Sequence, residues 1–534
     1  MDYVKEYDRW LSLNIMKNEL LKLSEKEKEE CFYKELTFGT GGIRAIMGPG
    51  PNRLNIYTIR KNTEGYARYV ESNNANHQGV VIAYDNRVNS KEFALESAKV
   101  LATHGIRVYL FDSLRPTPEL SFAVRYLKAF GGIVITASHN PPEYNGYKIY
   151  DHHGCQCVPR DTDTIIKYIQ GVEDLLSISI DETKSINIEY IGAKVDEAYY
   201  KKLLEVQEWP QLNKSIKIVY SPLHGTGYIP VSTMLNQLGY HLYKVEEQCY
   251  PDPFFSKTKS PNPENKKAFE KSIELAKEVD ADLIIATDPD CDRLGIVVKH
   301  NGSYEYLTGN QTGAILLEYL LSQKKEKGTL PNDGIVFNSI VTSDLGKKVC
   351  EKYGVEVEST LTGFKFIGDK IREYKGKKTF LFGYEESYGY MIKDFTRDKD
   401  GVQSSILVAE VCEYYKQCGK TLIDVLNDIY DEHGYVEDIQ ESETLPGIEG
   451  QKRMESIVNQ FRYENIKEIE GRKVIAKEDY LLSVRNDSNG ETILTLPKSN
   501  VIKLLLDDES WIVVRPSGNE PKIKYYKNLW RKRK

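Results

Sequence analysis

The chain has 534 residues, a formal net charge of -7, a hydrophobic fraction of 40% and a charged fraction of 28%. At about 150 residues per domain, this length predicts three or four domains with the composition of a soluble globular protein. The acidic balance excludes a typical nucleic-acid-binding protein. No run approaches the roughly 18 apolar residues that span a bilayer, which argues against a membrane protein.

The amino terminus, MDYVKEYDRWL, carries acidic residues and lacks the apolar core of a signal peptide. In so long a chain without an export signal, the scattered cysteines are expected to be reduced thiols. Cys155 and Cys157 form a CxC pair, but no second pair or histidine cluster with zinc spacing accompanies them. The sequence therefore favours a cytoplasmic protein and disfavours a zinc site.

A charged, helix-patterned opening over residues 1–36 leads into a glycine-rich turn at 38–50, FGTGGIRAIMGPG. Three units follow, each opening with an apolar run rich in β-branched residues, at 80–85, 216–221 and 335–339. Each run ends at a polar turn that precedes a helix-patterned segment. Such runs are typical of strands buried on both faces and alternating with helices, so the expected fold class is α/β.

A later strand of each unit ends in a polar loop. Residues 133–135 lead into TASHNPPEYNG, 283–286 into TDPDCDR, and 380–382 into GYEES. Ligands gather at the carboxyl ends of strands in open α/β sheets, so we expect three similar α/β domains around one cleft. The last hundred residues combine a helical pattern with strand-like runs at 500–506 and 511–514, which predicts a smaller C-terminal α+β domain.

The loop TDPDCDR places Asp288, Asp290 and Asp292 at alternating positions directly after a buried strand. Three close carboxylates with no lysine between them suit a hard cation such as Mg²⁺ or Ca²⁺. An EF-hand is excluded, because its sixth position requires Gly and its twelfth Glu, whereas Arg293 and Lys299 stand there. A solvated acidic turn is the alternative.

Three other loops allow both a chemical and a structural interpretation. Ser138 of TASHNPP stands where a nucleophile could be exposed, but serines in turns usually make local hydrogen bonds, and the GxSxG elbow is absent. RPSGNEPKIK offers a guanidinium, a hydroxyl and two lysines suited to a phosphate, or is a turn between two strands. FGTGGIR, with Arg44, is either an anion nest or a flexible turn.

Taken together, these loops resemble those of the α-D-phosphohexomutase family, the phosphoglucomutases and phosphomannomutases. The matching segments follow the family's order from about residue 38 to 526: FGTGGIR, AYDNR, TASHNPPEYNGYK, YSPLHGTG, TDPDCDR, TGFKFIGDK, GYEES and RPSGNEPKIK. The resemblance implies four domains: 1–189 with the phosphoserine, 190–303 with the metal, 304–426 with the sugar site, and 427–534 with the phosphate site.

The resemblance also implies a role for each matching residue. Ser138 is the expected phosphoserine and, through its phosphate, a ligand of Mg²⁺ beside the three aspartates. Four residues are expected to line the reacting end and assist proton transfer: Arg44, His139, Lys148 and Lys365. Arg293 is expected beside the metal, with Glu385 and Ser387 on the sugar hydroxyls. The non-reacting phosphate is expected to contact Arg515, Ser517, Gly518, Asn519 and Lys524.

The implied reaction converts glucose 1-phosphate reversibly to glucose 6-phosphate, with glucose 1,6-bisphosphate as intermediate and activator. The phosphoserine donates to the sugar monophosphate, the bisphosphate turns end for end, and its other phosphate returns to Ser138. Positioning and charge neutralisation dominate such transfers. The expected partners are small sugar phosphates, with no nucleic acid and no membrane, for a monomer or small homo-oligomer.

Two departures from the family pattern concern the last domain. Asn519 stands where the family usually has Thr, so an amide replaces a hydroxyl. Relatives usually continue beyond this loop through a strand and a helix, whereas only about a dozen residues follow it here. We therefore expect a fourth domain that lacks its terminal helix, is less stable than in relatives and is more open to proteolysis.

The substrate remains a choice among related sugars. GYEES followed by RDKDGV is similar to the phosphoglucomutase and phosphopentomutase subgroup, and Gly389 stands where the GEMSGH form of dual-specificity relatives has His. Glucose phosphates are favoured, with mannose and pentose phosphates as alternatives. Two other classes stay open: a magnesium-dependent sugar phosphatase, which would release phosphate without forming an isomer, and a noncatalytic sugar-phosphate binder, which would show no turnover.

Overall fold

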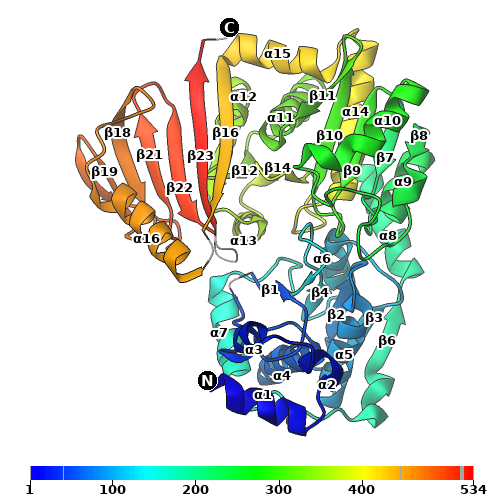
Figure 1. Ribbon diagram of the computed structural model, residues 1–534. Helices are drawn as coiled ribbons and strands as arrows, with labels where there is room; N and C mark the ends of the chain where they lie inside the picture. Colours follow the sequence, from blue (N-terminus) through cyan, green and yellow to red (C-terminus); the bar gives the residue numbers. More distant parts are fainter. Residues whose placement is uncertain (1, 40, 446, 518–521, 533–534) are drawn as a thin grey trace.

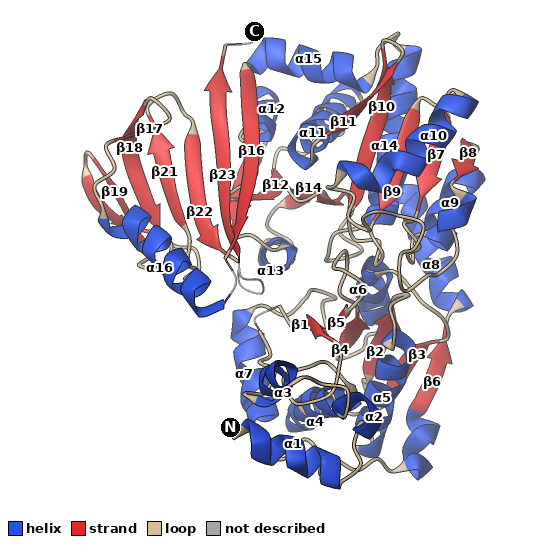
Figure 2. Ribbon diagram, in the orientation of Figure 1, coloured by secondary structure: helices blue, strands red, loops and turns tan. Residues whose placement is uncertain are grey.

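The computed structural model describes residues 2–39, 41–445, 447–517 and 522–532, which form four β-sheets with their helices (Figure 1). The first three sheets are mixed and lie in a body with helices packed around them, whereas the fourth stands beside that body (Figure 2). This arrangement confirms the expected α/β class. Among the described residues, no helix is both long and apolar enough to cross a bilayer.

The first sheet has the strand order β1-β5-β4-β2-β3-β6. Pairs β2–β3, β2–β4 and β3–β6 are parallel, and β5 runs antiparallel beside β4. The strands are β1 (Ile43–Ile46), β2 (Val80–Tyr84), β3 (Val108–Phe111), β4 (Gly131–Ile135), β5 (Tyr144–Asp151) and β6 (Ile188–Ile191). The helices are α1 (Tyr3–Ser12), α2 (Lys17–Leu20), α3 (Glu25–Phe32), α4 (Ile56–Ser72), α5 (Ser90–Thr103), α6 (Thr117–Tyr126) and α7 (Pro159–Gln170). The proposed boundary at 189/190 falls inside β6.

Strand β2 shows why this segment is a strand buried on both faces. Val81 and Ala83 face one hydrophobic cluster, and Val80 and Ile82 face another. Successive side chains of a strand point to opposite faces, so a continuous apolar run is required here. Sheet and helices therefore hold the carboxyl end of β4, where Ser138 follows, in a fixed position.

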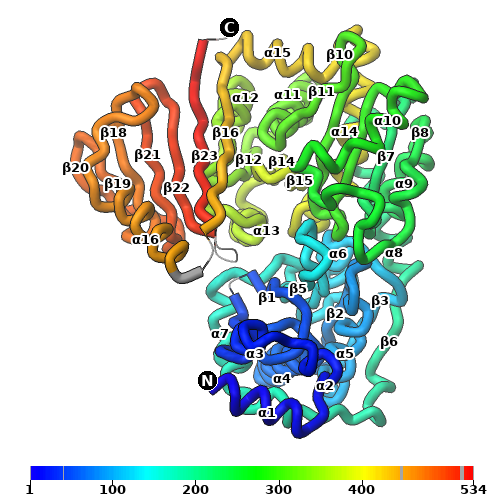
Figure 3. The backbone as a smooth tube through the Cα atoms, viewed as in Figure 1, coloured from blue at the N-terminus to red at the C-terminus, as the bar shows by residue number. Residues whose placement is uncertain are grey.

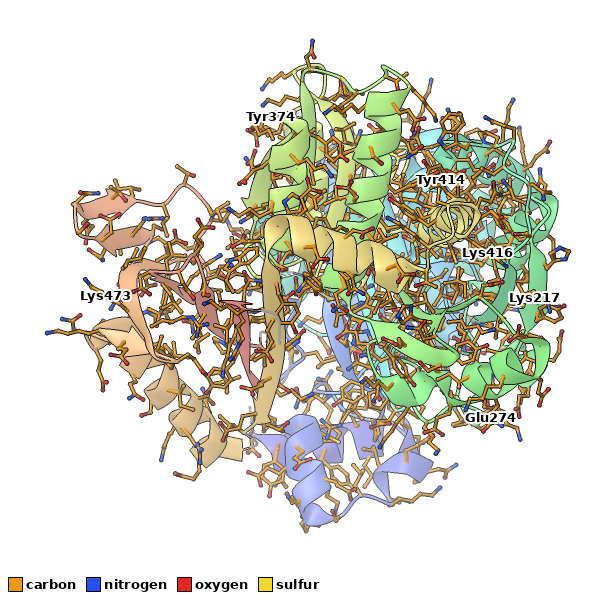
Figure 4. All side chains as sticks on the ribbon, turned by 90° about the horizontal axis from the view of Figure 1, so that it is seen from above. Lys217, Glu274, Tyr374, Tyr414, Lys416 and Lys473 are labelled. Carbon is orange, nitrogen blue, oxygen red and sulfur yellow. The ribbon has the colours of Figure 1, made fainter. Side chains whose placement is uncertain are left out.

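The second sheet has the order β11-β10-β9-β7-β8. Its strands are β7 (Lys217–Ser221), β8 (His241–Lys244), β9 (Leu283–Thr287), β10 (Leu294–His300) and β11 (Ser303–Leu307), with helices α8 (Ala193–Leu203), α9 (Tyr228–Gln237) and α10 (Glu270–Val279). Helix α14 (Gly401–Gln417), from the range 304–426, also packs against α9, β9 and β10. Its Lys416 lies 3.0 Å from the carboxylate of Asp282, on the same side of the molecule as Lys217 (Figure 4).

The third sheet has the order β13-β12-β14-β15. Its strands are β12 (Gly334–Ser339), β13 (Glu356–Thr360), β14 (Thr379–Glu385) and β15 (Gly389–Met391), with helices α11 (Gly309–Glu326), α12 (Leu345–Tyr353), α13 (Phe364–Glu373) and α15 (Leu422–His433). The proposed boundary at 426/427 falls inside α15. Short 3-10 helices occupy connections of the body: η1 (Glu182–Asn187), η2 (Leu204–Val206), η3 (Glu246–Gln248) and η4 (Lys266–Phe269).

The fourth sheet is antiparallel, in the order β16-β23-β22-β21-β18-β19-β20, with β17 on β18. Its strands are β16 (Tyr435–Thr444), β17 (Glu468–Ile469), β18 (Arg472–Asp479), β19 (Val484–Asp487), β20 (Gly490–Ile493), β21 (Ile502–Leu506), β22 (Trp511–Pro516) and β23 (Lys522–Arg531); α16 (Gly447–Tyr463) packs on β21 and β22. The final segment returns between β16 and β22 as β23 (Figure 3). Within the described residues no helix follows it.

Candidate active site

The loop after β4 holds Ser138 in a left-handed backbone conformation, with φ 50°. Such a conformation is uncommon for a residue with a side chain and needs support from its surroundings. Buried Arg87 supplies it, donating to the carbonyls of Ser138 at 2.5 Å and Asn140 at 2.6 Å. Arg44 donates to the Asn140 side chain at 2.9 Å. Arg87 belongs to AYDNR, for which the sequence suggested no role.

The loop after β9 carries the three aspartates, which are almost fully buried. Asp288 accepts hydrogen bonds from the backbone N–H groups of Asp292 at 3.1 Å and Arg293 at 2.9 Å, which closes the turn. The HGTG loop, residues 224–227, packs directly against this turn, because a Cβ on Gly225 would lie 2.4 Å from Cα of Pro289. Only glycine allows the two backbones to approach so closely.

The two loops meet across the boundary between the first and second sheets. Ser138 Oγ donates to Asp288 Oδ2 at 2.6 Å, and the Nδ1 atom of His139 lies 3.2 Å from the same hydroxyl. Thr117 at the start of α6 adds a second link, since its Oγ1 donates to Asp290 Oδ2 at 3.0 Å. The residues expected to carry the phosphoryl group and to bind the metal therefore lie side by side.

The charges of this cluster suit a divalent cation. Carboxylate oxygens of Asp288, Asp290 and Asp292 lie within 4.8 Å of one another. Burial, together with the other two carboxylates, raises the pKa of Asp288 well above its usual range. The Oδ1 atoms of Asp290 and Asp292 are buried without a hydrogen-bond partner in the described structure. Unpaired buried oxygens of this kind are expected where a cation binds.

Two lysines balance part of the negative charge. Lys148 on β5 lies 3.2 Å from Asp290, and Lys399 lies 3.0 Å from Asp292. Burial opposes the charged form of Lys399, but Asp292 and Asp398 outweigh it and raise its pKa. The sequence did not single out Lys399 as a site residue. Its side chain crosses Gly389, where an added Cβ would lie 2.1 Å from Lys399 Cδ, so a histidine there would displace it.

Arg293 connects the aspartate loop with GYEES and with a residue that the sequence missed. Its guanidinium pairs with Glu264 and donates to the carbonyl of Ser387 at 3.2 Å. Burial lowers the pKa of Lys524 on β23, with Glu264 opposing and Arg515 and Arg293 adding to the effect. Charged groups of the loops beside the second sheet therefore affect the charge of Lys524 in the fourth sheet. No sequence pattern marked Glu264, which lies in an irregular segment.

Two of the expected substrate-binding residues, Glu385 and Lys365, lie on different elements of the third domain. Glu385 is buried at the end of β14 and accepts a hydrogen bond from the Gly363 N–H at 2.6 Å; burial and neighbouring Glu386 raise its pKa to about 7. Lys365 is buried on α13, where its carbonyl accepts a hydrogen bond from the Cys155 thiol at 3.4 Å and its Nζ atom lies 5.2 Å from the centre of the Phe366 ring. Burial lowers the Lys365 pKa to about 8.

The expected phosphate loop joins β22 and β23. Arg515 pairs with Lys524 in the strand register, and the N–H of Ser517 donates to the carbonyl of Lys522 at 2.7 Å. These contacts bring two cations together at the end of a hairpin, an arrangement suited to a dianion. The predictions for Gly518 and Asn519 fall on residues outside the described part of the chain.

Comparisons with known proteins cover most of the chain. Models of phosphoglucomutase/phosphomannomutase α/β/α domains I, II and III match residues 35–175, 197–302 and 308–433. A phosphoglucomutase of Staphylococcus aureus (strain MRSA252) is 44% identical over 514 residues, which cover 95% of this chain and 92% of that protein.

Two solved structures share the fold. A phosphoglucomutase/phosphomannomutase family protein from Burkholderia thailandensis has a TM-score of 0.67 at 18% identity, over 92% of this chain and 93% of that one. The open form of pp63/parafusin, a phosphoglucomutase from Paramecium, has a TM-score of 0.68 at 17% identity, over 94% and 92%. At these identities the likeness concerns the fold alone.

Proposed function

The chain belongs to the phosphoglucomutase/phosphomannomutase family and is an isomerase of the phosphohexomutase type; we propose that Ser138 carries the transferred phosphoryl group. The reaction is the reversible conversion of glucose 1-phosphate to glucose 6-phosphate. The relatives at 42–44% identity over about 95% of the chain are phosphoglucomutases, which favours glucose over mannose and pentose phosphates.

One observation carries the proposed role of Ser138. Its hydroxyl donates to Asp288 at 2.6 Å, in a cluster of three buried carboxylates contributed by another domain. A serine that merely stabilises a turn needs no such neighbours, whereas a phosphoserine needs a cation beside it. The left-handed backbone at Ser138, held by Arg87, adds strain that a purely structural turn would not require.

Phosphoryl transfer requires little covalent assistance beyond the carrier itself. A hydroxyl of the sugar monophosphate attacks the phosphorus on Ser138. The P–Oγ bond breaks, a bond to the sugar oxygen forms, and the proton of the sugar hydroxyl passes to the freed Oγ. On the return step, Oγ attacks the other phosphate of glucose 1,6-bisphosphate and loses its proton, while the bond from that phosphorus to the sugar oxygen breaks and the sugar oxygen takes up a proton. Asp288 and His139 are the side chains in hydrogen-bond contact with Oγ, so one of them receives that proton.

The metal site fits Mg²⁺ by the chemistry of its oxygen donors. Asp288, Asp290 and Asp292, with the phosphate on Ser138, would hold the ion, which when bound neutralises charge on the transferred phosphoryl group. Lys148 and Lys399 fix the orientation of the Asp290 and Asp292 carboxylates. Arg293 contributes a further positive charge at the edge of the site.

The remaining residues bind the sugar and its second phosphate. Glu385 and Ser387 contact sugar hydroxyls, and the hairpin with Arg515 and Lys524 holds the phosphate that is not reacting. Because the bisphosphate must turn end for end, this hairpin accepts either phosphate. Lys365 on α13 is the remaining expected substrate-binding residue, and its pKa of about 8 leaves much of it protonated at neutral pH.

The proposed specificity is tested by a coupled assay with glucose, mannose and ribose 1-phosphates, compared by kcat/KM. Glucose 1-phosphate is expected to give the highest value and to yield glucose 6-phosphate without release of inorganic phosphate. A value for mannose 1-phosphate at least about tenfold higher would contradict glucose specificity. Phosphate release without isomer formation would identify a phosphatase instead.

A further inference from the structure

A pocket of about 280 Å³ lies between the first and third domains, outside the proposed active site. Basic side chains from both domains line it: Arg125, Lys128, Arg372, Lys375 and Arg397. Two histidines of the first domain, His152 and His153, also line the pocket. So many cations around one small pocket repel one another unless an anion joins them.

The pocket lies at the opposite end of the first sheet from Ser138. Lys128 and Ala129 precede β4, and Asp151, next to His152, pairs with Gly131 at the start of that strand. Ser138 follows the other end of β4, and five residues of strand span about 16 Å. The third domain contributes residues at the end of α13 and in the loop before α14. Figure 4 labels Tyr374, the neighbour of Lys375, towards the upper edge of the view.

Arg397 lines this pocket and has unmet hydrogen-bonding capacity. Its residue is 4% exposed, and its Nε and Nη1 atoms are buried without a partner among the described residues. Its remaining nitrogen, Nη2, lies 3.1 Å from Asp394. A buried guanidinium with two unpaired nitrogens is costly unless a ligand supplies acceptors. Phosphate oxygens match a guanidinium well, since they accept two parallel hydrogen bonds.

Other groups in the pocket show the same excess of positive charge. Burial and the nearby Arg397 guanidinium lower the pKa of Arg125 to about 10. Burial lowers the pKa of His153 to about 4, and His152, Arg397, Lys375 and Arg125 add to the effect. Arg372 is the exception, because its guanidinium pairs with two carboxylates, Asp151 at 3.3 Å and Asp369. Within the described part of the chain, Lys128 and Lys375 form no ion pair.

We infer that this pocket binds a small molecule that carries two or more phosphate groups. Cations from both walls can each hold one phosphate, so a ligand with phosphates at two positions links the first domain to the third. A single carboxylate or phosphate leaves one wall uncompensated. The size of the pocket suits a small metabolite and is too small for a macromolecular partner.

The pocket connects physically to the proposed metal site. Arg397 is followed by Asp398, which accepts a hydrogen bond from Tyr150 at 2.6 Å, and by Lys399, which lies 3.0 Å from Asp292. A ligand that pairs with Arg397 therefore acts on the segment that positions Lys399. We expect occupancy of the pocket to change the rate of the isomerase reaction.

Binding is tested by calorimetry with inorganic tripolyphosphate and metal-free protein. The pocket variant is R125Q/K375Q, and the control K184Q/K194Q removes two exposed lysines of equal charge. A third variant, R515Q/K524Q, removes the cations of the phosphate hairpin. The wild type, the control and R515Q/K524Q are expected to bind at the pocket, and R125Q/K375Q at least about tenfold more weakly. Equal binding by R125Q/K375Q and the wild type would overturn the inference.

The connection to catalysis is tested by turnover of glucose 1-phosphate against tripolyphosphate at constant free Mg²⁺. Competition in the active site affects wild type and R125Q/K375Q alike, so only their difference reports on the pocket. That difference is expected to reach about fivefold at saturation. Superimposable curves would overturn the coupling. Normal basal turnover of R125Q/K375Q shows that the variant is folded.

Discussion

The joint between the first and second domains brings the proposed reacting groups together, whereas the joint between the third and fourth is built from other buried contacts. At the first, buried polar groups of the proposed site meet directly: Ser138 with Asp288 at 2.6 Å and Thr117 with Asp290 at 3.0 Å. One hydrophobic cluster also runs through the first three domains and extends to Val436 of β16. At the second, Trp511 donates to Asp344 at 2.7 Å and Asn528 donates to Ser343 at 2.9 Å, and Trp511 belongs to a smaller apolar cluster.

We expect the two joints to serve two different steps of the reaction. Phosphoryl transfer needs reacting groups held to within a fraction of an ångström, and the direct contacts at the first joint suit that need. A bisphosphate that turns end for end instead needs a phosphate-binding domain that can move, so we expect motion of the fourth domain at the second joint. Arg515 lies on β22, the strand that begins at Trp511, so movement at this joint moves the phosphate hairpin.

The largest expected effect comes from the first joint. Asp290→Asn removes one charge of the metal cluster and leaves Lys148 without its closest carboxylate. We expect kcat for glucose 1-phosphate to fall about 10³-fold at saturating Mg²⁺. The control Asp280→Asn changes an exposed aspartate of the same domain and is expected to keep normal activity. Recovery of full activity by Asp290→Asn at high Mg²⁺ would show that this carboxylate is dispensable.

A substitution in the phosphate hairpin should reduce activity less than the change at Asp290. Arg515→Gln removes the planar donor expected to hold the non-reacting phosphate, and kcat/KM is expected to fall about 10²-fold. Arg453→Gln, an exposed arginine of the same domain, is the matched control. If the two variants had equal kcat/KM, the non-reacting phosphate would have to bind elsewhere.

Stability at the second joint should depend on pH through Lys503, which donates to the carbonyl of Ile340 at 2.8 Å. Burial lowers its pKa to about 8. Between that value and the ordinary lysine pKa of about 10.4, the unfolded chain binds more protons than the folded one. The free energy of unfolding contributed by Lys503 therefore rises with pH in this window, by about 2 kcal/mol.

The measurement is pulse proteolysis in urea, which follows the fourth domain separately, for wild type and Lys503→Met between about pH 7.5 and 9.5. The wild type should gain stability relative to Lys503→Met as the pH rises. Parallel profiles would show that Lys503 does not titrate with a lowered pKa.

The smallest expected effect compares two tryptophans, each with one indole hydrogen bond. Trp511→Phe removes the bond to Asp344 at the second joint, and Trp209→Phe removes the 2.7 Å bond to Gln323 inside the body. Each change is expected to cost about 1 kcal/mol. Hydrogen exchange should increase across β21 and β22 in Trp511→Phe alone. Equal exchange in β21 and β22 of both variants would contradict a fourth domain that opens independently of the other three.

Much of the fold follows from local patterns, and the exceptions have a physical cause. The apolar runs now seen as β2, β7 and β12 predicted strands, because only sheets covered on both faces bury such runs. The chain end was not predicted as a strand. It mixes polar and apolar residues without regular alternation, and it becomes β23 because β16 and β22 pair with it along both edges. Likewise, the packing of α14 on the second sheet depends on contacts distant in sequence.

Some residues of the candidate site likewise followed from local sequence patterns, and others did not. Ser138 and the three aspartates could be identified because each group follows a strand within a recognisable loop. Lys399 lies in RDKDGV, which indicated only a subgroup, and Glu264 lies in a segment without a pattern. Both reach the site through tertiary contacts, with Asp292 and Arg293 respectively. Sequence patterns do not encode such contacts directly.

The central claim is that the hydroxyl of Ser138 takes and returns the phosphoryl group. Intact mass spectrometry tests it most directly, after wild type and Ser138→Ala are incubated with glucose 1,6-bisphosphate and Mg²⁺. The wild type is expected to gain the mass of one phosphoryl group, and Ser138→Ala to gain none. Phosphorylation of both proteins to the same extent would place the carrier on another residue and contradict the account.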